Sequence, residues 1–183
     1  LRALQVDCLD IVHLHQWHYA WTHQPAWLDT LQRLREAGKL RLIAVSAQDH
    51  EHDALLEPVS RGMVDVVQVI ANVFESRPAN ALLPLCATRN VSVIARCVLD
   101  SGGLAGQLTR EEFRSRAFLK FAPYREYVSR TRALARAYVP SVAANLAELA
   151  IRFAISLPGV GWATIGMPMR VLVDDTMQAI ARG

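Results

Sequence analysis

Three polar side chains end or follow short apolar runs, where chemistry is possible: His15, Ser46 and Gln68. An imidazole in such a place can donate a hydrogen bond to a carbonyl oxygen or act as an acid. The amide of Gln68 offers a donor and an acceptor that suit a carboxamide ligand, and the Ser46 hydroxyl offers a weaker contact of the same kind. The alternative for each is structural: a packed or loop histidine, or a polar group satisfied within the core.

A glycine-rich stretch, Ser101-Gly102-Gly103-Leu104-Ala105-Gly106, is a second candidate for ligand binding. Backbone N–H groups in such a stretch can approach a phosphate closely. It is not a P-loop, because no Gly-Lys-Ser/Thr is present, and it does not match the GxGxxG dinucleotide fingerprint. Taken alone, the stretch is more typical of a flexible connector.

Apolar runs of strand length alternate with amphipathic stretches along the chain. The pattern predicts strands at 10–15, 41–46, 65–69, 91–96 and 161–166, and helices at 25–37, 50–61, 79–89, 124–138, 141–156 and 171–182. We expect Gly38 to end the first of these helices and Ser141 to cap a later one. Strands and helices that alternate about every 30 residues are typical of a parallel α/β sheet.

Two parallel architectures fit this alternation, a doubly wound sheet and a βα barrel. The polar residues at the carboxyl ends of the expected strands, Arg96 among them, favour the barrel, because its strand ends meet at one mouth. A complete barrel needs eight strands and about 250 residues. We therefore expect residues 1–183 to form a single domain that is part of a (β/α)8 TIM barrel, with the missing strands before Leu1.

The composition limits the class of protein. With 52% hydrophobic and 20% charged residues, the 183-residue chain is globular rather than disordered. A net charge of +3 is too small for a typical nucleic-acid binder, and the arginines between 110 and 136 are interpreted as solvated helix faces. No membrane span is expected. Three cysteines without a CxxC motif indicate free thiols in a reducing cytoplasm.

An ordered series of motifs resembles the aldo-keto reductase family. Residues 10–17 are similar to its D-x-x-x-x-H-W strand, and residues 38–46 to its G-K-x-R-x-I-G-V-S-N strand. Residues 64–72, 83–106 and 147–160 resemble the segments I-D-x-x-Q-x-x-Y-N, L-P-x-C…G-V-I-A…L-x-S-G-x-L-x-G and A-x-L-A-L-R-W…P-G-V. Each motif is weak alone, but together they cover nearly the whole chain in the right order.

The resemblance implies an oxidoreductase that reduces an aldehyde or ketone to an alcohol with NADPH, or with NADH as the alternative. This segment would supply strands four to eight of the barrel. His15 matches the histidine that polarises the substrate carbonyl. The matches to cofactor-binding residues hold the nicotinamide (Ser46, Gln68, Arg96), the pyrophosphate (Leu99, Ser101, Gly102, Leu104, Gly106) and the adenosine phosphate (Gly166, Arg170).

The family's catalytic aspartate, tyrosine and lysine lie upstream of the motifs found here. Neither Lys39 nor Lys120 matches that lysine, and Tyr19 does not match that tyrosine. We therefore expect the 183-residue segment alone to fold marginally, with an exposed sheet edge, and to lack turnover.

Two other functions stay open. Ala47 and Thr176 replace asparagines usual in the family, which would fit a non-catalytic subunit that keeps the binding surface but not the chemistry. Alternatively, the H-x-H pair of His13 and His15, with His50 and His52 after the next strand, could bind zinc, although no carboxylate ends a later strand to complete that site. The expected partner is a small carbonyl substrate; substrate identity and oligomeric state do not follow from the sequence.

Overall fold

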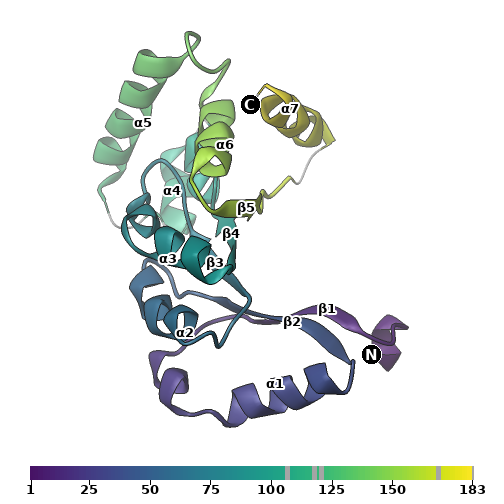
Figure 1. Cartoon of the computed structure of the whole chain (residues 1–183). Helices are drawn as coiled ribbons and strands as arrows, with labels where there is room; N and C mark the ends of the chain where they lie inside the picture. Colours follow the sequence, from purple (N-terminus) through teal and green to yellow (C-terminus); the bar gives the residue numbers. More distant parts are fainter. Residues whose placement is uncertain (106–107, 117–118, 120–121, 168–169, 183) are drawn as a thin grey trace. The chain divides into compact units, whose positions relative to one another are not determined.

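Five strands form one sheet in the computed structural model, which describes residues 1–105, 108–116, 119, 122–167 and 170–182. Their order in the sheet is β1-β2-β3-β4-β5, the same as in the sequence (Figure 1). β1 pairs with β2 and β2 with β3 in parallel. The parallel α/β fold predicted from the sequence is therefore confirmed. The strands are β1 (Leu9–Leu14), β2 (Leu40–Ser46), β3 (Val66–Ile70), β4 (Ser92–Arg96) and β5 (Val160–Ala163).

Helices connect these strands, as expected for βα units. The described α-helices are α1 (Ala26–Glu36), α2 (Leu56–Ser60), α3 (Leu82–Arg89), α4 (Arg110–Ser115), α5 (Tyr124–Tyr138), α6 (Leu146–Ser156) and α7 (Arg170–Ala181). Short 3₁₀ helices precede or link them: η1 (Arg2–Leu4), η2 (Tyr19–His23), η3 (His52–Leu55), η4 (Arg77–Asn80) and η5 (Asp100–Ala105). None of the described helices is both long enough and apolar enough to cross a lipid bilayer.

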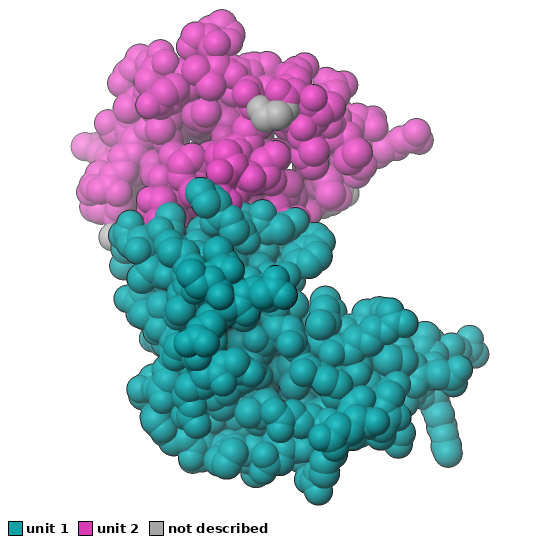
Figure 2. Space-filling view, viewed as in Figure 1, with its two compact units in different colours: residues 1–70, 77–94, 158–162 teal, residues 71–76, 95–157, 163–183 magenta. Residues whose placement is uncertain are grey.

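The chain contains two compact units, coloured separately in Figure 2. Unit 1 consists of residues 1–70, 77–94 and 158–162, and unit 2 of residues 71–76, 95–157 and 163–183. Each unit has its own set of buried side chains.

In unit 1, β2 and β3 are the most deeply buried strands. Four consecutive residues of β2, Ile43 to Ser46, are buried, as is usual for a parallel strand covered on both faces. The Asp65 carboxylate fixes the entry to β3, because it accepts a hydrogen bond from the Ile43 N–H (2.8 Å) and pairs with Arg35 of α1. β1 differs: Ile11, His13 and His15 share one face by alternation, and all three are exposed.

In unit 2, aromatic rings form one of the core clusters. Phe113 of α4 and Tyr127 of α5 are each only 6% exposed, and their ring centroids lie 5.6 Å apart. Phe74 packs edge-on against Tyr127 at 5.5 Å. The second cluster joins Leu104 to Leu146 and Ala150 of α6. The aromatic cluster therefore joins α4 to α5, and the second cluster joins the glycine-rich stretch to α6.

Several boundaries differ from those predicted. α6 begins at Leu146 because the Asn145 side chain, not Ser141, accepts the capping hydrogen bond from the Glu148 N–H (2.8 Å). β5 ends at Ala163, so Thr164, Ile165 and Gly166 follow the strand instead of belonging to it. α4 was not expected; Thr109 and Glu112 form a reciprocal capping box at its start. Gly38 does end α1, with a left-handed φ of 68°.

We predict that Gly103→Ala destabilises the protein. A Cβ built on Gly103 would lie 1.8 Å from the Tyr127 Oη, so the mutant must displace a buried ring. Overpacking of this kind costs about 1–3 kcal/mol in the free energy of unfolding, which urea denaturation measures.

The matched control is Gly161→Ala, where the nearest atom to an added Cβ is the Val93 carbonyl oxygen at 3.9 Å. Its unfolding free energy should change by less than about 0.5 kcal/mol. Equal urea midpoints for the two variants would contradict the close packing of Gly103 on Tyr127.

Candidate functional site

Ser46 and Gln68 lie side by side in unit 1, in register on neighbouring strands. The buried Ser46 Oγ donates a hydrogen bond to Gln68 Oε1 (3.3 Å). Because this bond occupies the carbonyl oxygen of Gln68, it leaves the Nε2 donors of the amide for a ligand. The sequence interpretation of these two residues as neighbours is therefore correct; their contact with a nicotinamide stays a prediction.

His15 directly follows β1, at the same level of the sheet. Leu14 pairs with Val45, so the next residue along β1 lies level with Ser46. His15 is exposed. In unit 1, His15 directly follows β1 and Ser46 ends β2, but Gln68 is the central residue of β3 and not its last, whereas the sequence had predicted all three at strand ends. The register nevertheless brings all three to one level of the sheet.

Trp17 fixes the segment that follows His15. It is 1% exposed, its N–H donates to the Ser46 carbonyl oxygen (2.7 Å), and its own carbonyl oxygen accepts from Gln48 Nε2 (3.2 Å). Its ring also packs edge-on against Trp21 and Trp27, with centroids 5.8 Å and 5.4 Å away. Trp17 is therefore a buried anchor for the chain beside His15 rather than an exposed wall of a substrate pocket.

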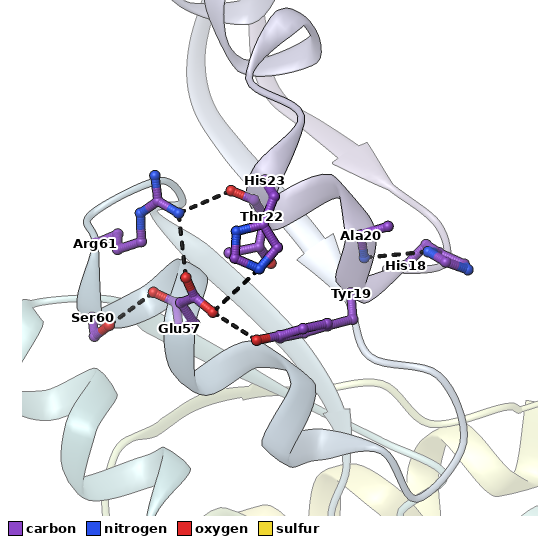
Figure 3. Close-up of polar contacts among 8 residues, drawn as sticks. All are labelled: His18, Tyr19, Ala20, Thr22, His23, Glu57, Ser60 and Arg61. Atoms are coloured by element: carbon purple, nitrogen blue, oxygen red, sulfur yellow. Dashed lines mark hydrogen bonds and ion pairs between the residues drawn. The ribbon is translucent and has the colours of Figure 1, made fainter.

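Glu57 of α2 holds the next segment, η2, in place (Figure 3). Its Oε2 accepts a hydrogen bond from the Tyr19 hydroxyl (2.8 Å), and its Oε1 from Arg61 Nη1 (3.3 Å). Arg61 also donates to the Thr22 carbonyl oxygen (2.9 Å), so it bridges α2 and η2. These contacts link η2 to α2 and so restrict the segment that begins at His15.

Tyr19 is the tyrosine nearest to His15 in the sequence, but its hydroxyl is committed to this contact. The hydrogen bond to Glu57, and then the Glu57 charge, raise the pKa of Tyr19. The Tyr19 hydrogen bond in turn lowers the pKa of Glu57. A phenol with a raised pKa is a weaker acid, so Tyr19 does not have the properties of a proton donor for carbonyl reduction.

In unit 2, the glycine-rich stretch is a well-defined loop rather than a plain connector. Asp100, Ser101 and Gly102 have left-handed φ values of 46°, 55° and 92°. The Asp100 carboxylate accepts hydrogen bonds from the Tyr127 hydroxyl (2.7 Å) and from Asn72 Nδ2 (3.4 Å). Burial, and then the Asp100 charge, raise the pKa of Tyr127. Tyr127 therefore keeps its proton and remains a donor.

This loop borders a cavity of about 640 Å³. Five residues that the sequence assigned to cofactor binding line it together: Arg96, Leu99, Ser101, Gly102 and Gly166. Thr164, also in the lining, donates through its N–H to the Ala95 carbonyl oxygen (2.8 Å), which holds the segment after β5 beside β4. Residues far apart in the sequence thus meet at one cavity within unit 2.

The remaining assigned residues lie elsewhere. Leu104 is fully buried in the core against Leu146 and Ala150 of α6 and is not part of the cavity lining, so its role in cofactor binding stays a prediction. Arg170 is the exposed first residue of α7 and is not part of the cavity lining. Gly106 lies outside the described residues.

Arg116, directly after α4, also belongs to this cavity, although the sequence interpretation did not select it. It lines the cavity, donates from Nη1 to the Ser101 carbonyl oxygen, and has a buried Nε without a hydrogen-bond partner among the described residues. A Cβ on Gly102 would lie 3.1 Å from Arg116 Nη1, so the guanidinium packs directly on bare glycine backbone. A cation with an unused donor beside a glycine loop fits the diphosphate of a dinucleotide.

The described residues do not form the zinc site that was the alternative for the histidines. Among the described residues, no group of three or more His, Cys, Asp or Glu side chains is arranged to hold a metal ion. Partial burial of the ring, and then the neighbouring His15, lower the pKa of His13.

Comparison with known proteins identifies the family. The model of the Aldo/keto reductase family matches residues 1–182. The NADH-specific methylglyoxal reductase of Escherichia coli (strain K12) is 28% identical over 118 residues, which make up 61% of this chain and 34% of that protein.

Solved structures show the same fold. An aldo-keto reductase from Bacillus halodurans in its holo form has a TM-score of 0.77 at 22% identity, over 98% of this chain and 57% of its own. A glycerol dehydrogenase from Gluconobacter oxydans has a TM-score of 0.64 at 20% identity, over 99% of this chain and 61% of its own. The chain thus spans about a third of the curated relative and somewhat over half of these two structural neighbours.

We predict that Arg116→Ala weakens dinucleotide binding to the protein at its natural length by ten- to hundredfold. The estimate follows from the loss of a charged hydrogen bond, about 1.5–3 kcal/mol. Fluorescence titration with a reduced nicotinamide dinucleotide measures the dissociation constant. The affinity of the variant for ADP-ribose, which keeps the diphosphate and lacks nicotinamide, should fall by the same factor.

Arg114→Ala is the matched control, because Arg114 lies on the same helix but is exposed and outside the cavity lining. Its dissociation constants should stay within about twofold of the wild type. If Arg116→Ala bound ADP-ribose as tightly as Arg114→Ala does, Arg116 would not contribute to the binding site.

Proposed function

Because the chain belongs to the aldo/keto reductase family, we propose that it is the larger part of an enzyme that reduces an aldehyde or ketone to an alcohol with NADPH or NADH. The observation that carries this proposal is the cavity of unit 2, where Arg96, Arg116 and the left-handed glycine loop surround space for a diphosphate. The Ser46–Gln68 pair of unit 1 supports it with an amide suited to a carboxamide ring substituent.

His15 has the central chemical role in this proposal. The bound dinucleotide supplies the hydride. As hydride reaches the carbonyl carbon, negative charge develops on oxygen, and a positioned donor there lowers the barrier. The imidazole of His15 donates that hydrogen bond and orients the carbonyl. Trp17 and the Glu57 contacts keep the chain beside it from moving, so the donor is already in place.

The proton for the product alcohol needs a separate acid. Tyr19 is not that acid, because its hydroxyl is bonded to Glu57 and its pKa is raised. We assign the acid, with its supporting aspartate and lysine, to a part of the protein outside these 183 residues, since the chain spans 57% of the Bacillus halodurans neighbour. On this proposal the 183 residues alone bind cofactor weakly and do not turn over substrate.

Small carbonyl compounds are the proposed substrates. The name of the Escherichia coli relative makes methylglyoxal the first compound to assay. The proposed location is the cytoplasm, because Cys8, Cys86 and Cys97 form no disulfide bond among the described residues, as is usual in a reducing compartment. Burial raises the pKa of Cys86 to about 11, which makes that thiol unreactive.

The second candidate function is a subunit that binds the dinucleotide without reducing anything. Ala47 favours it: the residue after Ser46 is a fully buried alanine, whose N–H donates to the Gln68 carbonyl oxygen (2.9 Å) but whose side chain offers no hydrogen bond. The two functions share the same binding surface. They differ in turnover, so reduction of a carbonyl by the protein at its natural length decides between them.

We predict opposite effects for two substitutions in that protein. His15→Ala should lower kcat by about 10²–10⁴-fold and leave cofactor affinity within about twofold, because it removes a donor that acts on the substrate. Gln68→Ala should weaken cofactor binding by about tenfold, as expected for the loss of one or two hydrogen bonds. Steady-state kinetics and fluorescence titration separate the two effects.

Gln16→Ala serves as the control, since Gln16 is the exposed neighbour of His15 and makes none of the contacts described above. Both its kcat and its cofactor affinity should match the wild type. If His15→Ala weakened cofactor and Gln68→Ala stopped turnover, the two roles would be interchanged.

A further inference from the structure

Helix α5 of unit 2 carries a row of arginines that the proposed function does not use (Figure 1). Steps of four, three and four residues place the members of this row on one face of the helix. They are Arg125, Ser129, Arg132 and Arg136, and all four are exposed. With a rise of 1.5 Å per residue, the row is about 16 Å long.

The arginine row borders a cavity of about 410 Å³, which Tyr124 and Val128 of the same helix also line. A further cavity, of about 240 Å³, shares Tyr124, Val128 and Arg132 with it and is lined by Gly103 as well. The two cavities are therefore adjacent, and Arg132 belongs to both. The larger cavity has the size of a site for a small molecule.

The positive charge of the arginine row is not balanced within the protein. No acidic side chain belongs to the described lining of either cavity. Arg125, Arg132 and Arg136 make no hydrogen bond or ion pair with another described residue, whereas Arg130 of the same helix pairs with Glu126. Arg132 and Arg136 lie four positions apart, so their charges repel each other. A bound anion would relieve that repulsion.

We infer that the arginine row binds a small ligand that carries two or more phosphate groups. A guanidinium donates paired hydrogen bonds to phosphate oxygens, and several guanidinium groups in a row suit a ligand with several phosphates. The Ser129 hydroxyl adds a neutral donor between Arg125 and Arg132. The row itself contains no aromatic side chain on which the bases of a nucleic-acid strand could stack.

This site is independent of the proposed function. Its two cavities share no described lining residue with the cavity beside Arg116. Loss of phosphate binding at α5 would therefore leave the cofactor site as proposed, and loss of cofactor binding would leave the arginine row as it is.

The test is isothermal titration calorimetry of inorganic triphosphate with the protein at its natural length. The Arg116→Ala variant is used, so that the proposed cofactor cavity contributes little to the binding. Triphosphate should bind at least about tenfold more tightly than orthophosphate at equal ionic strength, because it can contact more than one guanidinium at once. Equal affinities, or no binding, would overturn the inference. Tighter binding of a short single-stranded oligonucleotide than of triphosphate would also overturn it, in favour of nucleic acid.

Arg132→Gln in the same background tests the residue that belongs to both cavities. Triphosphate affinity should fall about tenfold, as expected for the loss of charged hydrogen bonds. Arg130→Gln is the matched control: it removes an equal charge from the same helix, about 160° away from Arg132 and outside both linings. Its affinity should stay within about twofold of the parent. Equal losses in the two variants would mean that net charge alone attracts triphosphate, and would exclude a site at the arginine row.

Discussion

The hydrogen bond between Tyr127 and Asp100 is the interaction on which the binding surface of unit 2 depends. It holds a loop with three successive left-handed residues, a conformation that is costly for Asp100 and Ser101 without such support. Asn72 also stabilises the loop, since its side-chain amide donates hydrogen bonds to the Asp100 carboxylate and to the Cys97 carbonyl oxygen. With the loop fixed, Gly102 presents bare backbone, and the Arg116 guanidinium can pack upon it.

In unit 1, backbone hydrogen bonds hold the candidate binding residues in position. The Trp17 N–H bonded to the Ser46 carbonyl oxygen joins the segment after β1 to the end of β2, and the Ala47 N–H bonded to the Gln68 carbonyl oxygen joins β2 to β3. Parallel pairing alone aligns the strand ends. The polar side chains at those ends therefore owe their proximity to the sheet, and their orientation to a few contacts such as that of Ser46 with Gln68.

The sequence predicted the features that depend on periodicity and local signals. The existence and order of the five strands, the end of α1 at Gly38 and the family were correct, because apolar alternation and glycine conformation are local properties. It could not predict Arg116, which stands in an arginine-rich stretch and gains its role from a packing contact 14 residues back in the chain, with Gly102. It also misplaced the start of α6, because Ser141 and Asn145 are both good caps. In the structure the N–H groups of Val142 and Ala143 donate to the Tyr138 carbonyl oxygen, and Asn145 caps the helix.

The ion pair of Arg182 with Glu148 has a thermodynamic consequence. Arg182 directly follows α7 and Glu148 belongs to α6, so the pair fastens the last turn of the chain to its neighbour. A ligand bound in the cavity of about 330 Å³ between α6 and α7 would add its own contacts to this ion pair. Occupancy of the cavity and docking of α7 are then linked equilibria, each shifting the other by the same free energy. The C-terminal helix would then gain protection from proteolysis and amide exchange when the cavity is filled.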